Sequence, residues 1–122
     1  MADYTASKAK FNAGVDLTLT AVGDTQTVDL SDVGDERALL IVQNNNDSVA
    51  VNTATITIAS GDFLANALGD LSVDVADGGA IKVIGPLEGA RFKTTGSKIT
   101  VGVAVTQSGT VSDVSLGIVK LP

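Results

Sequence analysis

The stretch Ile99-Thr-Val-Gly-Val-Ala-Val-Thr106 alternates between β-branched aliphatic residues and small or polar ones. A two-residue period is typical of a β-strand with one buried face, because successive side chains point to opposite sides of the strand. Residues 53–58, 71–76 and 114–119 show the same alternation, with Thr or Ser at many of the intervening positions. These segments predict half-buried strands that share one core.

A continuous aliphatic run, Leu39-Leu-Ile-Val42, predicts a further strand that is central and covered on both faces. Weaker strand candidates are residues 15–22, 26–30, 80–84 and 90–93. Clusters of Asn, Asp, Gly and Pro separate these segments and favour turns. Short strands joined by turns, with no sustained helical pattern, predict an all-β fold: a single antiparallel β-sandwich or jelly-roll-like domain.

The N-terminal segment differs from the rest of the chain. Residues 1–14 show no alternation and end at a glycine, so they predict a short, non-regular N-terminal arm ahead of a β-sandwich domain at residues 15–122. The arm is either a frayed end or a segment that lies on a neighbouring subunit, where Tyr4 and Phe11 would be buried. Removal of residues 2–13 is expected to leave the fold intact.

The interior is expected to be aliphatic, because the 122-residue chain has three Phe, one Tyr and no Trp. The predicted core residues are Leu40, Val42, Ile56, Ile58, Leu71, Val73, Val75, Ile99, Val101, Val103, Leu116 and Ile118. Burial of a Val, Leu or Ile side chain contributes roughly 1.5 to 3 kcal/mol, and ordering a residue costs about as much. A partner that buries further surface is therefore expected to stabilise this fold.

The composition argues against an enzyme. The chain has no His and no Cys, which removes the commonest general base, the thiolate nucleophile and most zinc ligands. We expect no catalytic residues, no cofactor and no small-molecule substrate. The densest acidic segment contains Asp29, Asp32 and Asp35 and lacks the spacing of an EF-hand. It is either a solvated loop or a structural calcium site.

Charge excludes a further class of partner. The formal charge is −6 with only eight Lys and Arg residues, whereas nucleic-acid binding depends on cations that neutralise phosphates. No apolar run approaches the ~20 residues that span a bilayer, and residues 1–10 lack the hydrophobic centre of a signal peptide. We expect neither nucleic acid nor membrane as a partner, and folding in the cytoplasm.

The segment Gly85-Pro-Leu-Glu-Gly-Ala-Arg-Phe92 combines a rigid turn with an arginine and an aromatic residue. Arg and aromatic residues are enriched at protein interfaces, so Arg91 is a candidate partner-binding residue. In the alternative interpretation, Phe92 fills the core and Arg91 pairs with Glu88.

Residues 37–122 resemble small head-associated proteins of tailed bacteriophages. The similar pieces are Glu36-Arg-Ala-Leu-Leu-Ile-Val-Gln-Asn44, Thr55-Ile-Thr-Ile-Ala-Ser-Gly-Asp-Phe63, Gly69-Asp-Leu-Ser-Val73, Ile84-Gly-Pro-Leu-Glu-Gly-Ala-Arg-Phe92 and Ile118-Val-Lys-Leu-Pro122. The resemblance implies a β-sandwich that decorates or cements the outside of an icosahedral shell. Residues 1–36 do not match the pattern.

The resemblance also implies a place and partners for the chain. It would be a virion structural protein on the capsid exterior, made in the host cytoplasm and bound to a shell of major capsid protein. Association as a homotrimer is expected from the local three-fold sites of such shells, with Tyr4, Phe11 and Arg91 as candidate contacts. The alternatives are a structural protein of the tail or fibre, and a surface adhesive module; the adhesive module would be expected to have a signal peptide.

Overall fold

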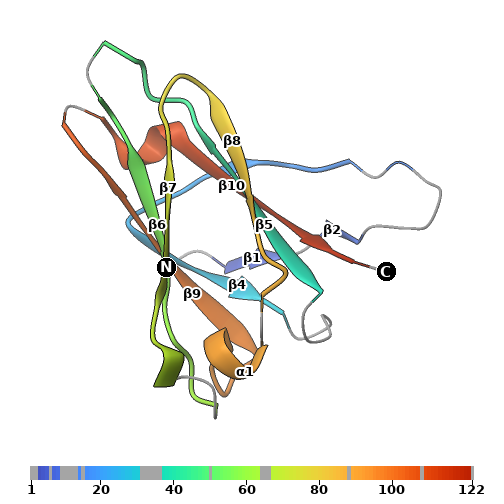
Figure 1. The fold of residues 1–122 in the computed structure, drawn as a ribbon. Helices are drawn as coiled ribbons and strands as arrows, with labels where there is room; N and C mark the ends of the chain where they lie inside the picture. The colour runs from blue at the N-terminus through green and yellow to red at the C-terminus, as the bar shows by residue number, and fades with distance from the viewer. Residues whose placement is uncertain are drawn as a thin grey trace.

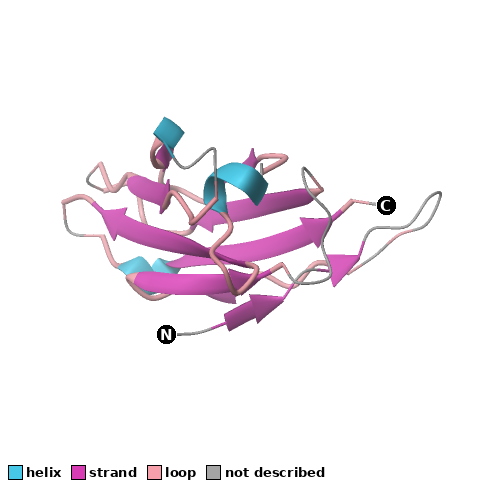
Figure 2. Ribbon diagram, turned by 90° about the horizontal axis from the view of Figure 1, so that it is seen from below, coloured by secondary structure: helices cyan, strands magenta, loops and turns pink. Residues whose placement is uncertain are grey.

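The computed structural model describes residues 3–5, 7–8, 14, 16–30, 37–49, 51–63, 67–87, 89–107 and 109–121. Over these residues the fold is a β-sandwich of two antiparallel four-stranded sheets, each extended by one parallel strand (Figure 1). The predicted antiparallel β-sandwich is confirmed. Strands make up nearly all of the regular structure (Figure 2).

The first sheet, sheet A, is built around the strand predicted from the 99–106 alternation. It contains β4 (Thr25–Asp29), β9 (Lys98–Val105), β6 (Ala54–Ile58) and β7 (Leu71–Val75) in that spatial order, and β1 (Asp3–Thr5) pairs in parallel with β4. Each antiparallel strand corresponds to a segment predicted from the sequence. β7 forms one edge of the sheet.

The second sheet, sheet B, contains β10 (Val114–Lys120), β5 (Ala38–Asn44) and β8 (Ala80–Ile84) in that order. Two short strands, β2 (Ser7–Lys8) and β3 (Thr20–Ala21), lie along the other edge of β10; β2 is parallel to it and β3 antiparallel. β8 forms the free edge. Sheets A and B enclose the core between them.

Part of the N-terminal segment differs from the irregular arm that the sequence predicts. Asp3–Thr5 and Ser7–Lys8 each extend a sheet, and Tyr4 lies opposite Val28 in the ladder and packs against the core. Backbone hydrogen bonds hold such short edge strands, so they need no alternating pattern. Phe11 lies outside the described residues.

Two of the weaker strand predictions are corrected. Residues 90–93 were expected to be a strand, but Gly89–Phe92 forms a helical turn, α1, which directs Phe92 into the core. Four residues are too few for a pattern to separate a strand from a turn. Of residues 15–22, only Thr20–Ala21 is a strand in the described part. A 3-10 turn, η2 (Val111–Asp113), precedes β10.

The predicted core is largely confirmed. Every predicted core residue is buried except Leu71 and Val73, which are half-buried because β7 is an edge strand. Further buried apolar residues are Val22, Val28, Leu30, Ala38, Ala54, Ile84, Leu87, Phe92 and Val114. Among the described residues, no helix has the length and hydropathy needed to cross a membrane.

The strand expected to be covered on both faces has only one buried face. Along β5, buried and half-buried residues alternate, and Leu39 and Ile41 point away from the core. The continuous aliphatic run therefore marks a strand whose outer face is also apolar. This outer face is the most distinctive surface of the described molecule.

Candidate interaction surface

The outer faces of the two sheets differ in chemistry. On sheet A the outward positions of β6 and β7 carry hydroxyl and carboxylate groups, which bond to one another across the ladder. Thr55 Oγ1 donates to Asp74 Oδ1 at 2.9 Å, and the hydroxyls of Thr57 and Ser72 lie 3.4 Å apart. Sheet A thus presents a polar, well-hydrated surface.

On sheet B the outward positions are mainly aliphatic. The register places Ile41 of β5 between Val83 of β8 and Gly117 of β10, and it places Leu39 beside Val119. One step along the strands, Gln43 lies between Ile81 and Ser115. We call this surface the aliphatic face and define it by Leu39, Ile41, Ile81, Val83 and Val119.

The aliphatic face is open to solvent at β8. Ile81 is 59% exposed and Val83 is 58% exposed, although both lie beside the half-buried Ile41 and Gln43 in the ladder. Single exposed aliphatic side chains are ordinary on protein surfaces, whereas a contiguous apolar patch is a candidate site of contact with another protein.

A loop segment ahead of β3 extends the aliphatic face over β10. Gly117 is buried, and a Cβ atom at this position would lie 2.9 Å from Leu17 Cδ1 and 2.8 Å from Leu19 Cδ2. The missing side chain therefore lets both leucines pack down onto the strand. Leu17 remains 39% exposed, so this cover is itself apolar on its outer side.

The edge between β7 and β8 is closed by a lysine. Lys82 points to the inner side of β8, opposite Val42, and its Nζ donates to the backbone carbonyl of Asp74 at 2.8 Å. The side chain spans from one sheet to the other, so a charge lies across the opening where both sheets end. A lysine at an edge opposes strand-to-strand aggregation, which leaves the flat aliphatic face as the apolar surface of sheet B.

Tyr4, a candidate contact residue, is occupied within the chain. Its hydroxyl donates to the carbonyl of Ala21 at 2.8 Å, so it ties β1 of sheet A to β3 of sheet B. Partial burial raises the pKa of Tyr4, because the charged phenolate loses hydration there. Phe11, the second candidate from the arm, lies outside the described residues.

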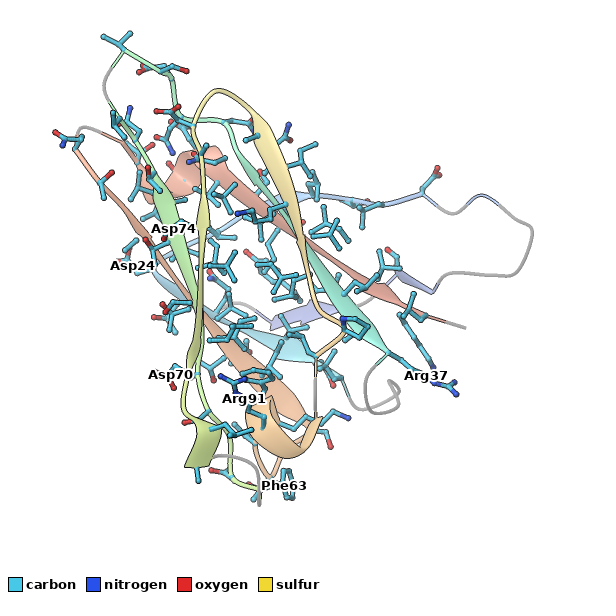
Figure 3. The ribbon with its side chains drawn as sticks, viewed as in Figure 1. Asp24, Arg37, Phe63, Asp70, Asp74 and Arg91 are labelled. Atoms are coloured by element: carbon cyan, nitrogen blue, oxygen red, sulfur yellow. The ribbon has the colours of Figure 1, made fainter. Side chains whose placement is uncertain are left out.

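Arg91, the third candidate, is held at one end of the sandwich (Figure 3). Its Nε donates to the carbonyl of Gly69 at 3.1 Å, its Nη2 donates to the carbonyl of Asp70 at 3.3 Å, and its guanidinium lies 4.8 Å from the centroid of the Phe92 ring. Phe92 is 3% exposed and fills the core, as the alternative interpretation of this segment expected. Glu88 lies outside the described residues.

The possible calcium site falls mostly outside the described part of the chain. Asp29 ends β4 and is half-buried, whereas Asp32 and Asp35 are not described. Within the described ranges, no group of three or more acidic side chains is arranged to hold a metal ion.

The loops at the two ends of the sandwich carry further exposed apolar residues. Val49 and Val51, which are 94% and 70% exposed, follow β5 at one end. Phe63 and Leu68, at 46% and 65%, lie between β6 and β7 at the opposite end, where Arg91 is also located (Figure 3). Each end thus offers a small apolar contact of its own.

A buried polar network supports the first of these ends. Asn44 Nδ2 donates to the carbonyls of Asn52 and Val75 at 2.9 and 3.1 Å, and its Oδ1 accepts from the Asn46 side chain at 2.7 Å. Asn46 Nδ2 in turn donates to the carbonyl of Thr110. These bonds replace the backbone partners that the ends of the strands lack, so they hold the loops in fixed positions.

Sequence reasoning predicted the strands that carry the aliphatic face but not the face itself. Two signals were present: the run Leu39-Leu-Ile-Val42, which has no polar position, and Ile81 and Val83 on either side of Lys82. Only the register shows that these aliphatic positions lie side by side.

No protein-family model matches this chain, and comparison with curated proteins and with solved structures gives no match either.

Proposed function

We propose that this chain is a virion structural protein that decorates or cements the outside of a tailed-phage head, where it binds a preassembled shell of major capsid protein. The observation that carries the proposal is the apolar surface that the folded sandwich leaves exposed at its two ends, with Val49 and Val51 at one end and Phe63 and Leu68 at the other, since exposed apolar surface favours contact with another protein. The resemblance of residues 37–122 to head-associated phage proteins supports the choice of assembly.

The charge distribution fits a role on the outer surface of a head. The chain carries a formal charge of −6, and Asp29 and Asp74 lie at outward positions of sheet A. In the proposed arrangement this polar sheet faces solvent, and the packaged nucleic acid is not a partner. The protein acts by surface contact and performs no chemistry.

The stabilisation of the shell by a bound protein follows from mass action. A protein that binds assembled subunits and not dissociated ones stabilises the assembled state by RT ln(1 + [L]/Kd), which is about 2.7 kcal/mol per site at a hundredfold excess over Kd. Because each head offers many equivalent sites, small contacts at the ends of the sandwich are sufficient. We propose that one end of the sandwich makes this shell contact.

The test is binding to heads of the phage whose genome encodes this chain, prepared without the protein. Purified protein should co-sediment with empty heads to a saturable occupancy, and the decorated heads should withstand higher temperature than bare ones. Protein that stays in the supernatant at every concentration, or purified virions that lack the chain by mass spectrometry, would contradict the proposal.

A matched pair of variants identifies the end that contacts the shell. The double variant Val49→Asp/Val51→Asp adds two charges at one end, and Phe63→Asp/Leu68→Asp adds the same charge at the other. All four side chains are exposed, so both variants should fold. One pair should lower shell occupancy at least about tenfold and the other should leave it unchanged. Wild-type occupancy for both variants would show that neither end makes the contact.

A further inference from the structure

We infer that copies of this chain exchange their N-terminal strands, so that β1 and β2 of one copy extend the two sheets of another. The inference goes beyond the proposed function, because the exchange takes place between copies of the chain and requires no shell. We call β1 and β2 the donor strands, and we call the edges of β4 and β10, together with β3, the acceptor.

The first argument is that the donor strands contact distant parts of the chain (Figure 1). Tyr4 lies opposite Val28 in β4, and Ser7 lies opposite Val119 in β10. The Tyr4 hydroxyl also donates to the carbonyl of Ala21 in β3 at 2.8 Å. All of these partners follow the connection at residues 9–19, so the same strands of a second copy can make the same contacts.

The second argument is the type of pairing. Both donor strands run parallel to their partners, which no tight hairpin turn can join, and eleven residues separate the end of β2 from the start of β3. A flexible connection of this kind holds a segment near its own site at an effective concentration in the ~mM range. Exchange replaces each contact by an identical one, so a second copy has only to match that local concentration.

The third argument is charge, and it identifies the occupant. Residues 1–10 contain two of the eight cationic side chains and one of the fourteen acidic ones, so their formal charge is +1. The rest of the chain keeps six cationic and thirteen acidic side chains, a formal charge of −7. Whole copies repel each other, but the donor segment of one copy is attracted to the acidic body of another.

An empty acceptor is unfavourable, which restricts the assemblies to closed ones. Without the donor strands, the edges of β4 and β10 present unpaired backbone groups, and the buried Val28 loses the packing of Tyr4. Two copies that exchange strands across a two-fold axis fill both acceptors, and three copies that pass them around a three-fold axis fill all three.

Deletion of residues 9–16 provides a test, because it leaves three residues between β2 and β3. Lys8 lies opposite Lys120 and Thr20 lies opposite Leu116, so their separation along one edge of β10 is about 13 Å. Four Cα steps cover about 14 Å only when they are straight, and β2 itself occupies that path. The shortened chain therefore cannot fill its own acceptor.

Light scattering measures the native mass of the shortened chain. We expect a dimer or trimer, whereas deletion of residues 2–16, which removes the donor strands together with the same connection, should give a monomer. Tyr4→Ala in the shortened chain should weaken its association at least about tenfold, because Tyr4 packs against the core of the body on which it lies. A shortened chain that is monomeric would overturn the inference.

A second measurement uses the full-length chain, which has no cysteine of its own. The variants Ser7→Cys and Val119→Cys are mixed at about 1 mM and treated with a short bifunctional maleimide. Exchange places the two thiols on neighbouring strands of different copies, so a covalent heterodimer should form. Ser72→Cys, at an exposed position on β7, replaces Val119→Cys in the control mixture and should give none.

A yield of heterodimer no higher than in the Ser72→Cys control would also overturn the inference. This readout does not depend on the folding of a deletion variant. Co-sedimentation with heads is scored separately on wild-type protein, so a chain that binds heads without exchange refutes the exchange alone, and a chain that exchanges without binding heads refutes the proposed function alone.

Discussion

At the scale of single residues, the buried asparagines explain how this sandwich closes one of its ends. Asn44 is fully buried, and both of its amide hydrogens and its carbonyl oxygen are used. Nearby, Asn52 is 2% exposed and its Oδ1 has no hydrogen-bond partner among the described residues. A buried amide with all its bonds made fixes the loops around it, and a substitution there leaves several groups unpaired at once.

The substitution Asn44→Asp tests this role. It keeps the size of the side chain but replaces two donated hydrogen bonds with contacts between a carboxylate and the carbonyls of Asn52 and Val75. We expect the free energy of unfolding at neutral pH to fall by about 2 to 4 kcal/mol. Denaturant unfolding measures the loss.

The matched control is Asn45→Asp, because Asn45 is the exposed neighbour that follows the last residue of β5. It should change the free energy of unfolding by no more than about 0.5 kcal/mol. Equal effects of Asn44→Asp and Asn45→Asp would show that added charge in this loop, and not the buried network, determines the result.

Tyr4 gives a spectroscopic test of the described arm. Partial burial raises its pKa above the ordinary value of 10.0. Because the neutral phenol is preferred in the folded state, its contribution to stability is complete below the unfolded pKa and is lost as pH rises through the folded pKa. The chain has one Tyr and no Trp, so the near-ultraviolet absorbance of tyrosinate reports this residue alone. The titration midpoint should lie above 10.0 in native protein and return to about 10 in denaturant.

If Tyr4 instead titrates at the same pH in native and denatured protein, its side chain is not held against β3. Tyr4→Phe removes the signal and one hydrogen bond to Ala21. Its effect on stability should stay within about 0.5 to 1.5 kcal/mol.

At the scale of elements, the sequence was most informative where a long alternation meets one buried face. The pattern at residues 99–106 predicts β9 nearly to its ends, because each Val is buried against the other sheet or packed on the core. It was less informative for residues 90–93, where Phe92 is buried from a helical turn. Pairing between distant segments, such as β1 with β4, leaves no local pattern to detect.

The aliphatic face illustrates the same limit for the candidate site. The sequence predicts that Leu39 and Ile41 belong to a strand buried on both faces. A run of aliphatic residues has the same pattern whether its second face is covered by this chain or by another. Only the register and the exposure of the neighbouring Val83 separate these cases. Two of the contact residues predicted from residue type, Tyr4 and Arg91, form hydrogen bonds within the chain, and their contact with a partner stays a prediction.

The expected effect of removing residues 2–13 follows from the pairing of β1 with β4 and of β2 with β10. The sequence alone predicts that deletion of this arm abolishes shell binding and leaves the fold intact, but the deletion takes away a strand from each sheet and the packing of Tyr4. We expect the truncated protein to stay β-rich by circular dichroism and to melt at least about 4 °C lower than the full chain. An unchanged melting temperature would show that these strands add nothing to the stability of the sandwich.

At the scale of the whole molecule, an interior with few aromatic residues is combined with aliphatic side chains, Ile81 and Val83, that are more than half exposed. Among the described positions, the buried apolar residues are one Phe and otherwise aliphatic residues, and charged residues make up 18% of the chain. Hydrophobic burial of about 25 cal/mol per Å² is therefore limited within a single chain. The aliphatic face of sheet B adds buried area only when a partner covers it.

This division of burial between fold and assembly predicts that stability depends on concentration. If the expected self-association contributes to the folded state, the melting temperature of wild-type protein rises as its concentration rises, because the associated form is favoured by mass action. The variant Ile81→Glu/Val83→Glu should melt close to the wild-type value at high dilution, since both side chains are more than half exposed in the single chain. Scanning calorimetry over a hundredfold range of concentration, about 1 to 100 μM, measures both. A wild-type melting temperature that is constant over this range would mean that the single chain is stable by its own core and that association adds nothing to it.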